Sequence, residues 1–294
     1  MDYSKSFKKE SPFLNVMGMG GGVSSLLTLA SGEITYIDDV FSTFLYTGNS
    51  TNRSINNGID LDGEGGMVWI KRRDGTDSHA LFDTERGVNK GLRSNTTGAE
   101  LTDTVSLTSF NSNGFSLGTG YNHHAVNYNN LTHCSWTFRK CPGFFDVVTY
   151  TGNGTGGHSI SHNLGSVPGF IIVKRTSGSD GWFCYHRSLG NTKMVALNGS
   201  GAAGTATQYW NDTSPTSTTF TVGTDTAVNA DGETYVAYLF AHNDGLFGED
   251  SDEAVIKCGS YTGNGTSSNS VTLGFEPQWL LVKDSSSTNN WGIY

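Results

Sequence analysis

The chain has 294 residues, a formal net charge of −9 and only 15% charged residues, with 39 glycines and 12% aromatic residues. An acidic chain without a basic stripe is not expected to bind nucleic acid. So few charges also argue against long amphipathic helices, whereas glycine, asparagine and aromatic residues suit short strands joined by tight turns.

The first 40 residues predict an extended anchoring arm. An apolar stretch from Pro12 to Ala30 follows Lys5, Lys8 and Lys9, which is also the pattern of a secretory signal. Four glycines within five residues weaken that alternative, and they leave the stretch too broken to span a membrane. We therefore expect it to be buried against a partner protein. The expected anchor residues are Pro12, Phe13, Leu14, Val16, Met17, Met19, Leu26 and Leu27.

A sequence repeat follows the arm. The hexapeptide YTGNGT occurs at 150–155 and 261–266, with a degraded copy, YTGNST, at 46–51. Each is followed by an apolar run that ends in lysine, at Lys71, Lys174 and Lys283, with offsets of 174 − 71 = 103 and 283 − 174 = 109 residues. Units of this size are whole domains. Recurrent strand-length runs with Asn-Gly and Asp-Gly turns predict an all-β chain of tandem β-sandwiches, and the hexapeptides themselves are interpreted as structural turns.

These offsets define the expected domains. They are the arm at 1–40, a first sandwich at 41–145, a second at 146–243, an acidic linker at 244–256 and the start of a third, truncated copy at 257–294. A third of a unit has too few strands to close a core, so further units are expected beyond it.

Catalytic and metal-binding patterns are weak. Asp60, Asp62 and Glu64 resemble a calcium loop without the distant closing glutamate, so a hairpin turn is favoured over a weak Ca²⁺ site. His123, His124 and His133 are interpreted as a polar loop rather than a zinc site. Acidic residues at 248–253 are interpreted as linker rather than a glycosidase pair. With no catalytic motif, we expect no enzyme and no cofactor. The four cysteines have no metal-ligand spacing and predict no metal, no disulfide and assembly in a reducing cytoplasm.

The matched blocks resemble a known module. YTGNGTGGHSISHNLGSVPGFIIVKR, followed by WFCYHRSLG and YVAYLFA, is similar to a repeated module of tail-fibre-like virion proteins from phages of marine bacteria, including cyanophages. GGMVWIKRRDGTDSHALFDTERG in the first copy looks like the same module. The resemblance covers residues 41–294 and implies concanavalin-like jelly-roll sandwiches, as in lectins. It implies no catalytic residues.

The resemblance leads to the expected function. It implies a tail fibre in the virion, assembled in the host cytoplasm, with the arm docked on a tail adaptor, nozzle or other virion protein. The sandwiches are expected to bind a host-surface glycan, and the resemblance suggests a homotrimer. Aromatic faces in the second copy would bind sugar. Trp182 and Tyr185 lie on or near a predicted strand, so one of them is expected in the core, whereas Tyr209 and Trp210 are expected to be exposed because a polar loop follows them. The candidate residues are Trp182, Tyr185, His186, Tyr209 and Trp210.

Two other functions remain open. A purely structural capsid or tail appendage would be favoured by a regular fit of one unit against the next. A polysaccharide depolymerase would require paired carboxylates in one cleft.

Overall fold

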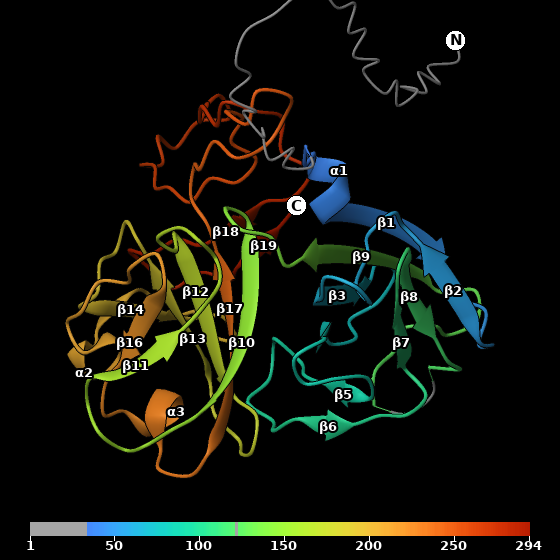
Figure 1. Ribbon diagram of the computed structural model, residues 1–294, viewed down its shortest axis with the longest axis horizontal. Helices are drawn as coiled ribbons and strands as arrows, with labels where there is room; N and C mark the ends of the chain where they lie inside the picture. Colours follow the sequence, from blue (N-terminus) through green and yellow to red (C-terminus); the bar gives the residue numbers. More distant parts are fainter. Residues whose placement is uncertain (1–33, 121–122) are drawn as a thin grey trace, which may run out of the picture. The chain divides into compact units, whose positions relative to one another are not determined.

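The computed structural model describes residues 34–120 and 123–294, which are mostly β (Figure 1). The helices in these ranges are single turns: α1 (Ile37–Val40), α2 (Thr207–Trp210) and α3 (Thr226–Asn229). No helix in the described ranges is long and apolar enough to cross a membrane. The expected anchor residues from Pro12 to Leu27 lie outside the described residues, so their burial stays a prediction.

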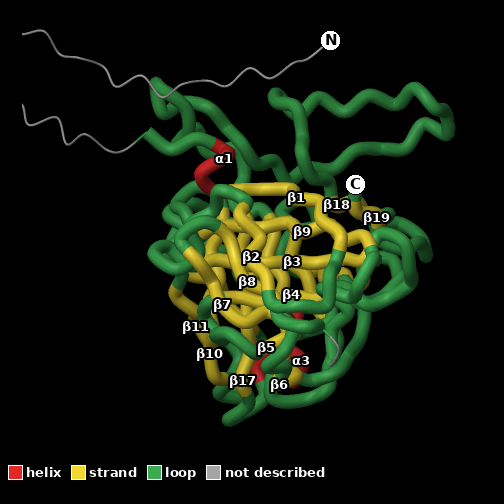
Figure 2. Tube along the Cα trace, turned by 90° about the vertical axis from the view of Figure 1, so that its right-hand side faces the viewer, coloured by secondary structure: helices red, strands yellow, loops and turns green. Residues whose placement is uncertain are grey.

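The N-terminal part, residues 34–144, has two main antiparallel sheets with a core between them. The first sheet has the order β1-β9-β3-β4, and these strands run side by side in Figure 2. Their bounds are β1 (Phe41–Thr47), β9 (Thr132–Arg139), β3 (Gly66–Arg72) and β4 (Ala80–Asp83). The second sheet has the order β2-β8-β7, with β2 (Arg53–Asn56), β8 (Gly114–Leu117) and β7 (Leu107–Asn111). A separate pair is formed by β5 (Lys90–Gly91) and β6 (Leu101–Thr102).

The central part, residues 145–243, repeats the order of the larger sheet. Its six strands follow the order β10-β17-β12-β13-β14-β15. They are β10 (Phe145–Thr151), β17 (Thr234–Phe240), β12 (Phe170–Arg175), β13 (Trp182–His186), β14 (Lys193–Ala196) and β15 (Gly204–Thr205). A pair, β11 (His158–Ser161) and β16 (Thr219–Val222), completes this part. The register also matches, because Met67 lies opposite Phe138 in the first sheet and Phe170 lies opposite Phe240 in the second.

The apolar runs of β3 and β12 are buried on both faces of their sheets. Along β3, Val68 and Ile70 enter the core of the N-terminal part, while Met67 and Trp69 enter a core shared with the other parts. Along β12, Ile171 and Val173 face the core of the central part, while Phe170 and Ile172 enter the shared core. Successive side chains of a strand point to opposite faces, so a continuous apolar run fits a strand between two cores.

The C-terminal part, residues 244–294, packs onto the shared core. Its strands β18 (Leu281–Val282) and β19 (Gly292–Ile293) form a short hairpin. Trp279 stacks on Phe240, with ring centroids 6.3 Å apart and planes at 15°. The expected acidic linker is fixed at Phe247, which is buried and makes an edge contact with Phe144. All three parts therefore contribute to one apolar cluster.

The Thr-Gly-Asn turns are fixed by buried asparagines. Asn229 is fully buried, and its Nδ2 donates to the carbonyls of Gly223 and Thr155 at 2.7 and 2.9 Å. Its Oδ1 accepts the backbone N–H of Asn153 at 2.9 Å. Asn127 holds the first turn in the same way, through Gly118, Thr51 and Asn49. These bonds support the interpretation of the hexapeptides as structural turns.

We expect Asn229→Ala to destabilise the fold by about 2–3 kcal/mol, because it removes these hydrogen bonds and leaves the buried carbonyl of Gly223 without its side-chain donor. Chemical denaturation measures the loss. The matched control is Asn264→Ala in the third hexapeptide, which is exposed and bonds only within its own turn. That control should change stability by less than about 0.5 kcal/mol. Equal losses in the two variants would contradict the role of Asn229 in fixing its turn.

Candidate functional site

The aromatic residues predicted to bind sugar are in the interior. Trp182, Trp210, Tyr185 and Tyr209 are 0%, 2%, 5% and 8% exposed. The expectation that Tyr209 and Trp210 are exposed is wrong, because the single turn of α2 directs both rings inward. Trp210 Nε1 donates to the carbonyl of Lys193 at 3.0 Å, and its ring makes an edge contact with Tyr185. As folded, these four rings present no face to a glycan.

His186 is half-buried and serves its own turn. Its Nδ1 accepts the backbone N–H of Ser188 at 3.1 Å. Burial and the nearby Arg187 lower its pKa. The five candidates therefore do not converge on one open surface.

The other residues considered as metal ligands make structural hydrogen bonds within the fold. Asp60 Oδ1 accepts the N–H of Gly63 at 2.8 Å, which closes a turn that contains Asp62, and Glu64 follows this turn. His133 is buried, and its Nε2 bonds the carbonyl of Ala125 at 3.0 Å. Within the described ranges, no group of three or more His, Cys, Asp or Glu side chains could hold a metal ion.

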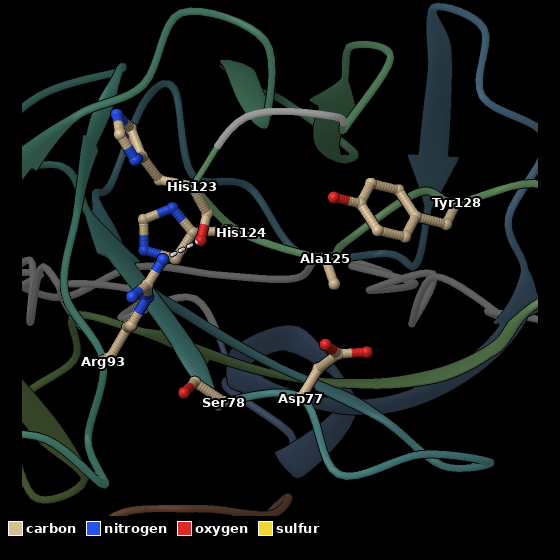
Figure 3. Close-up of a pocket in the computed structure, with 7 residues that line it drawn as sticks. All are labelled: Asp77, Ser78, Arg93, His123, His124, Ala125 and Tyr128. Atoms are coloured by element: carbon tan, nitrogen blue, oxygen red, sulfur yellow. Dashed lines mark hydrogen bonds between the residues drawn. The ribbon is translucent and has the colours of Figure 1, made fainter.

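A polar pocket of about 210 Å³ lies in the N-terminal part (Figure 3). It is lined by Asp77, Ser78, Arg93, His123, His124, Ala125 and Tyr128. In the figure Arg93 reaches towards the loop of His123, whose carbonyl accepts a hydrogen bond from its guanidinium. The residues that align with Asp77 and His123 in the central part are Asp180 and Asp225, and there Tyr209 interacts with both.

The acid–histidine pair behind this pocket, Asp103 and His124, belongs to a buried hydrogen-bond network with a structural role. Asp103 accepts Ser106 Oγ at 2.6 Å and lies 3.0 Å from His124 Nδ1. Burial raises the pKa of Asp103, but these hydrogen bonds outweigh it and the net pKa is lowered. Burial lowers the pKa of His124. The serine bonds the carboxylate and not the imidazole, so the three residues lack the serine–histidine–acid order of a nucleophilic triad.

A buried ionic network joins the N-terminal and central parts. Arg86 Nε donates to Asp83 Oδ2 at 2.6 Å, and both side chains are almost inaccessible. Tyr238 of β17 donates its hydroxyl to Asp83 Oδ2 at 2.8 Å, and Arg86 also pairs with Glu100 at 3.2 Å. Burial opposes the charge of Arg86, but Asp83 outweighs it and the pKa of Arg86 is raised. Sequence reasoning missed this network. Its only signal was charge at 83–86, where the aligned second copy has His186-Arg-Ser-Leu.

A second contact joins the loop at 93–100 to the central sheet. Trp182 Nε1 lies 3.1 Å from the carbonyl oxygens of both Arg93 and Thr96. Lys174 Nζ lies 3.4 Å from the carbonyl of Thr97 and donates to that of Arg175 at 2.6 Å. Both side chains are fully buried. Trp182 and Lys174 therefore act together as donors that hold the loop of the preceding part.

Burial lowers the pKa of Lys174 to about 8, against an ordinary value of 10.5. The unfolded chain keeps this proton up to about pH 10.5, so it binds more protons than the folded chain between these two values. Stability from this group should therefore rise with pH in that window. From pH 7.5 to 9.5, we expect the native chain to gain about 2 kcal/mol over Lys174→Met in chemical denaturation. A constant difference between the two proteins would contradict this prediction.

Of three comparisons with known proteins, only the one with protein families gives a match. No curated protein matches the chain, and no solved structure matches it. Residues 37–294 match a domain of unknown function, DUF7483, which begins at the first residue of α1 and includes all three parts of the shared core. The match covers most of the sequence, and the chain therefore belongs to the DUF7483 family.

Proposed function

We propose that this chain is a structural protein of a bacteriophage tail-fibre-type appendage, built from tandem copies of one jelly-roll-like module. The copies are residues 41–145 and 146–243, with part of a third at 257–294. The common strand order of the two larger sheets and the matched register of β3 and β12 support this repeat. The virion assignment rests on the resemblance of the repeated blocks to phage appendage modules.

The shared core carries the proposal. Phe138 from the first copy contacts Phe240 from the second at 5.5 Å and Trp279 from the third at 5.4 Å. Domains of one chain move relative to one another unless the interface between them is large and hydrophobic. A common apolar interior therefore suits a stiff appendage better than flexibly linked binding domains. This regular fit of unit against unit favours the structural role over a depolymerase. Four acidic side chains of the predicted linker, at positions 249, 250, 252 and 253, are exposed and do not line the pocket of Figure 3.

Host recognition is the second function that we propose. The pocket in Figure 3 combines the guanidinium of Arg93 with polar groups of Asp77, Ser78 and Tyr128, a donor and acceptor set that suits a polyhydroxyl ligand. Glycan-array binding tests it, with Arg93→Lys as the variant. Binding that survives equally in Arg93→Lys would place recognition elsewhere.

Deleting residues 1–30 should leave the modules folded but remove the protein from particles, because the apolar arm is the proposed attachment to a tail adaptor or nozzle. The measurement is quantification of the protein in purified virions, with the melting temperature of the truncated protein as the control for folding. Normal incorporation of a folded truncation would overturn the anchor. Absence of the full-length protein from virions would overturn the appendage.

The homotrimer stays a prediction. Several linked sites would raise weak glycan binding by about 10²–10⁴. Native mass measurement at micromolar concentration decides it, and a clean monomer would exclude the trimer.

A further inference from the structure

The contact made by Trp182 occurs a second time in the chain. Trp291 Nε1 donates to the carbonyl of Ala196 at 2.9 Å. Trp291 aligns with Trp182, since 291 − 109 = 182, and Ala196 aligns with Arg93, since 196 − 103 = 93. The lysine contact recurs as well, because Lys283 Nζ lies 3.2 Å from the carbonyl of Ser200. By the same offsets this pair corresponds to Lys174 and Thr97.

Two backbone hydrogen bonds also recur, with donors and acceptors at equivalent positions of the repeat. Asp180 N–H donates to Thr97 O at 2.8 Å, and Asn289 N–H donates to Ser200 O at 2.9 Å. In the opposite direction, Glu100 N–H donates to Thr176 O at 2.9 Å, and the corresponding bond from Ala203 to Ser285 is also 2.9 Å. We call residues 93–100 and 196–203 the docking loops. Four matched bonds mean that each docking loop holds the next copy in the same relation.

The recurrent contact arranges the three copies around the shared core. The third copy follows the second along the chain, yet it also touches the first. Trp279 contacts Trp69 at 6.3 Å between ring centroids, and Thr43 Oγ1 donates to the carbonyl of Gln278 at 3.3 Å. Head-to-tail contacts of one kind form a closed ring when the rotation between units closes. Contact between the third copy and the first is the sign of closure after three units.

The first copy carries the same receiving face. Positions equivalent to Thr176, Asp180 and Trp182 are Arg73, Asp77 and His79, each 103 residues earlier. Lys71 Nζ donates to the carbonyls of Arg72 and Gly75, as Lys174 does to those of Arg175 and Gly178. In the described part of the chain, no docking loop of another copy bonds these positions. Asp77 lines the pocket of Figure 3, so this face opens onto it.

His79 retains the chemistry of the tryptophan that it replaces. Its Nδ1 accepts the indole N–H of Trp69 at 2.9 Å, which fixes the neutral tautomer with its proton on Nε2. That N–H is a donor of the same kind as the indole N–H of Trp182. Burial, with Lys71 nearby, lowers the pKa of His79 to about 4, so the neutral form prevails at pH 7.

We propose that the face formed by Lys71, Arg73, Asp77 and His79 is the third seat of a closed three-module ring, and that it receives the docking loop of a complete third copy. The proposal rests on the repeat described under Proposed function. One ring then contains three modules around one aromatic core, and the pocket of Figure 3 lies at the junction between the third module and the first.

The test extends the full chain by a copy of residues 186–243 placed directly after Tyr294, which aligns with Tyr185. Hydrogen exchange then compares the extended and native chains. We expect protected amides in the new strands and at least tenfold slower exchange of the Asp77 amide, because Asp77 takes the place of Asp180 as donor to the docking loop. The matched control carries the same extension with its copy of 196–203 replaced by a Gly-Ser segment of equal length, and its Asp77 amide should exchange as in the native chain.

A second variant keeps the test decisive. His79→Phe in the extended chain removes the Nε2 donor and should reverse part of the protection. Unchanged Asp77 exchange in the extended chain, equal protection in the Gly-Ser control, or an extension without protected amides would each overturn the ring. Protection that appears only in a dimer would assign the seat to a second chain and also overturn closure within one chain. None of these readouts depends on virion incorporation, so failure of the ring is distinguishable from failure of the proposed function.

Discussion

Trp182→Ala is expected to cost about 3–5 kcal/mol of folding stability, the range for removing a large buried aromatic side chain. The indole is fully buried and stacks on Tyr238, with ring centroids 6.4 Å apart. Its removal leaves a cavity between the N-terminal and central parts and takes the donor from the carbonyls of Arg93 and Thr96. Chemical denaturation with fluorescence detection measures the loss.

Two control variants separate the cavity from the hydrogen bonds. Trp182→Phe keeps an aromatic ring but removes the N–H and part of the ring volume, so it should cost about 1–3 kcal/mol, less than Trp182→Ala. Trp291→Ala removes the equivalent side chain of the third copy, which is half-buried, and should cost less than Trp182→Ala. A Trp182→Ala variant as stable as the native chain would show that Trp182 does not hold the two parts together.

Arg86→Met is expected to destabilise the protein by about 3–5 kcal/mol, because it leaves a buried carboxylate without its counter-charge. The side chain of Asp83 is 0% exposed, and its remaining side-chain partner is the hydroxyl of Tyr238. Thermal or chemical denaturation measures this change.

The matched control is Arg72→Met on the surface. Arg72 pairs with Asp74 and Asp77, but both carboxylates are more than a third exposed, so the loss should be about 0–1 kcal/mol. Similar losses in Arg72→Met and Arg86→Met would contradict the role of the buried network.

The strands could be predicted from the sequence. Met67-Val-Trp-Ile and Phe170-Ile-Ile-Val are strands as expected, because β-branched and aromatic residues between glycine-rich turns favour extended backbone. The offset of 103 residues between Lys71 and Lys174 correctly placed β3 and β12 at the same position in two sheets. What these runs did not show is that both faces of each strand are covered, which depends on how the copies pack.

The burial of the aromatic residues of the second copy could not be predicted in the same way. Trp182 follows a Gly-Ser-Asp-Gly loop, a setting that suits an exposed sugar-binding tryptophan as well as a buried one. The docking loop that covers it begins 182 − 93 = 89 residues earlier, and no local pattern connects the two segments. Tyr209 and Trp210 were misplaced because their polar neighbours, 211–215, follow a single helical turn that already points both rings inward.

Hydrogen exchange on the native chain tests most directly whether one recurrent contact assembles the copies. The amides of Asp180 and Glu100 at the first contact, and of Asn289 and Ala203 at the second, lie in loops but donate to the neighbouring copy. The account predicts that all four exchange slowly, and that Trp182→Ala accelerates the first pair more than the second. Exchange of Asn289 and Ala203 at the rate of free loops would contradict the recurrent contact, and with it the three-module ring.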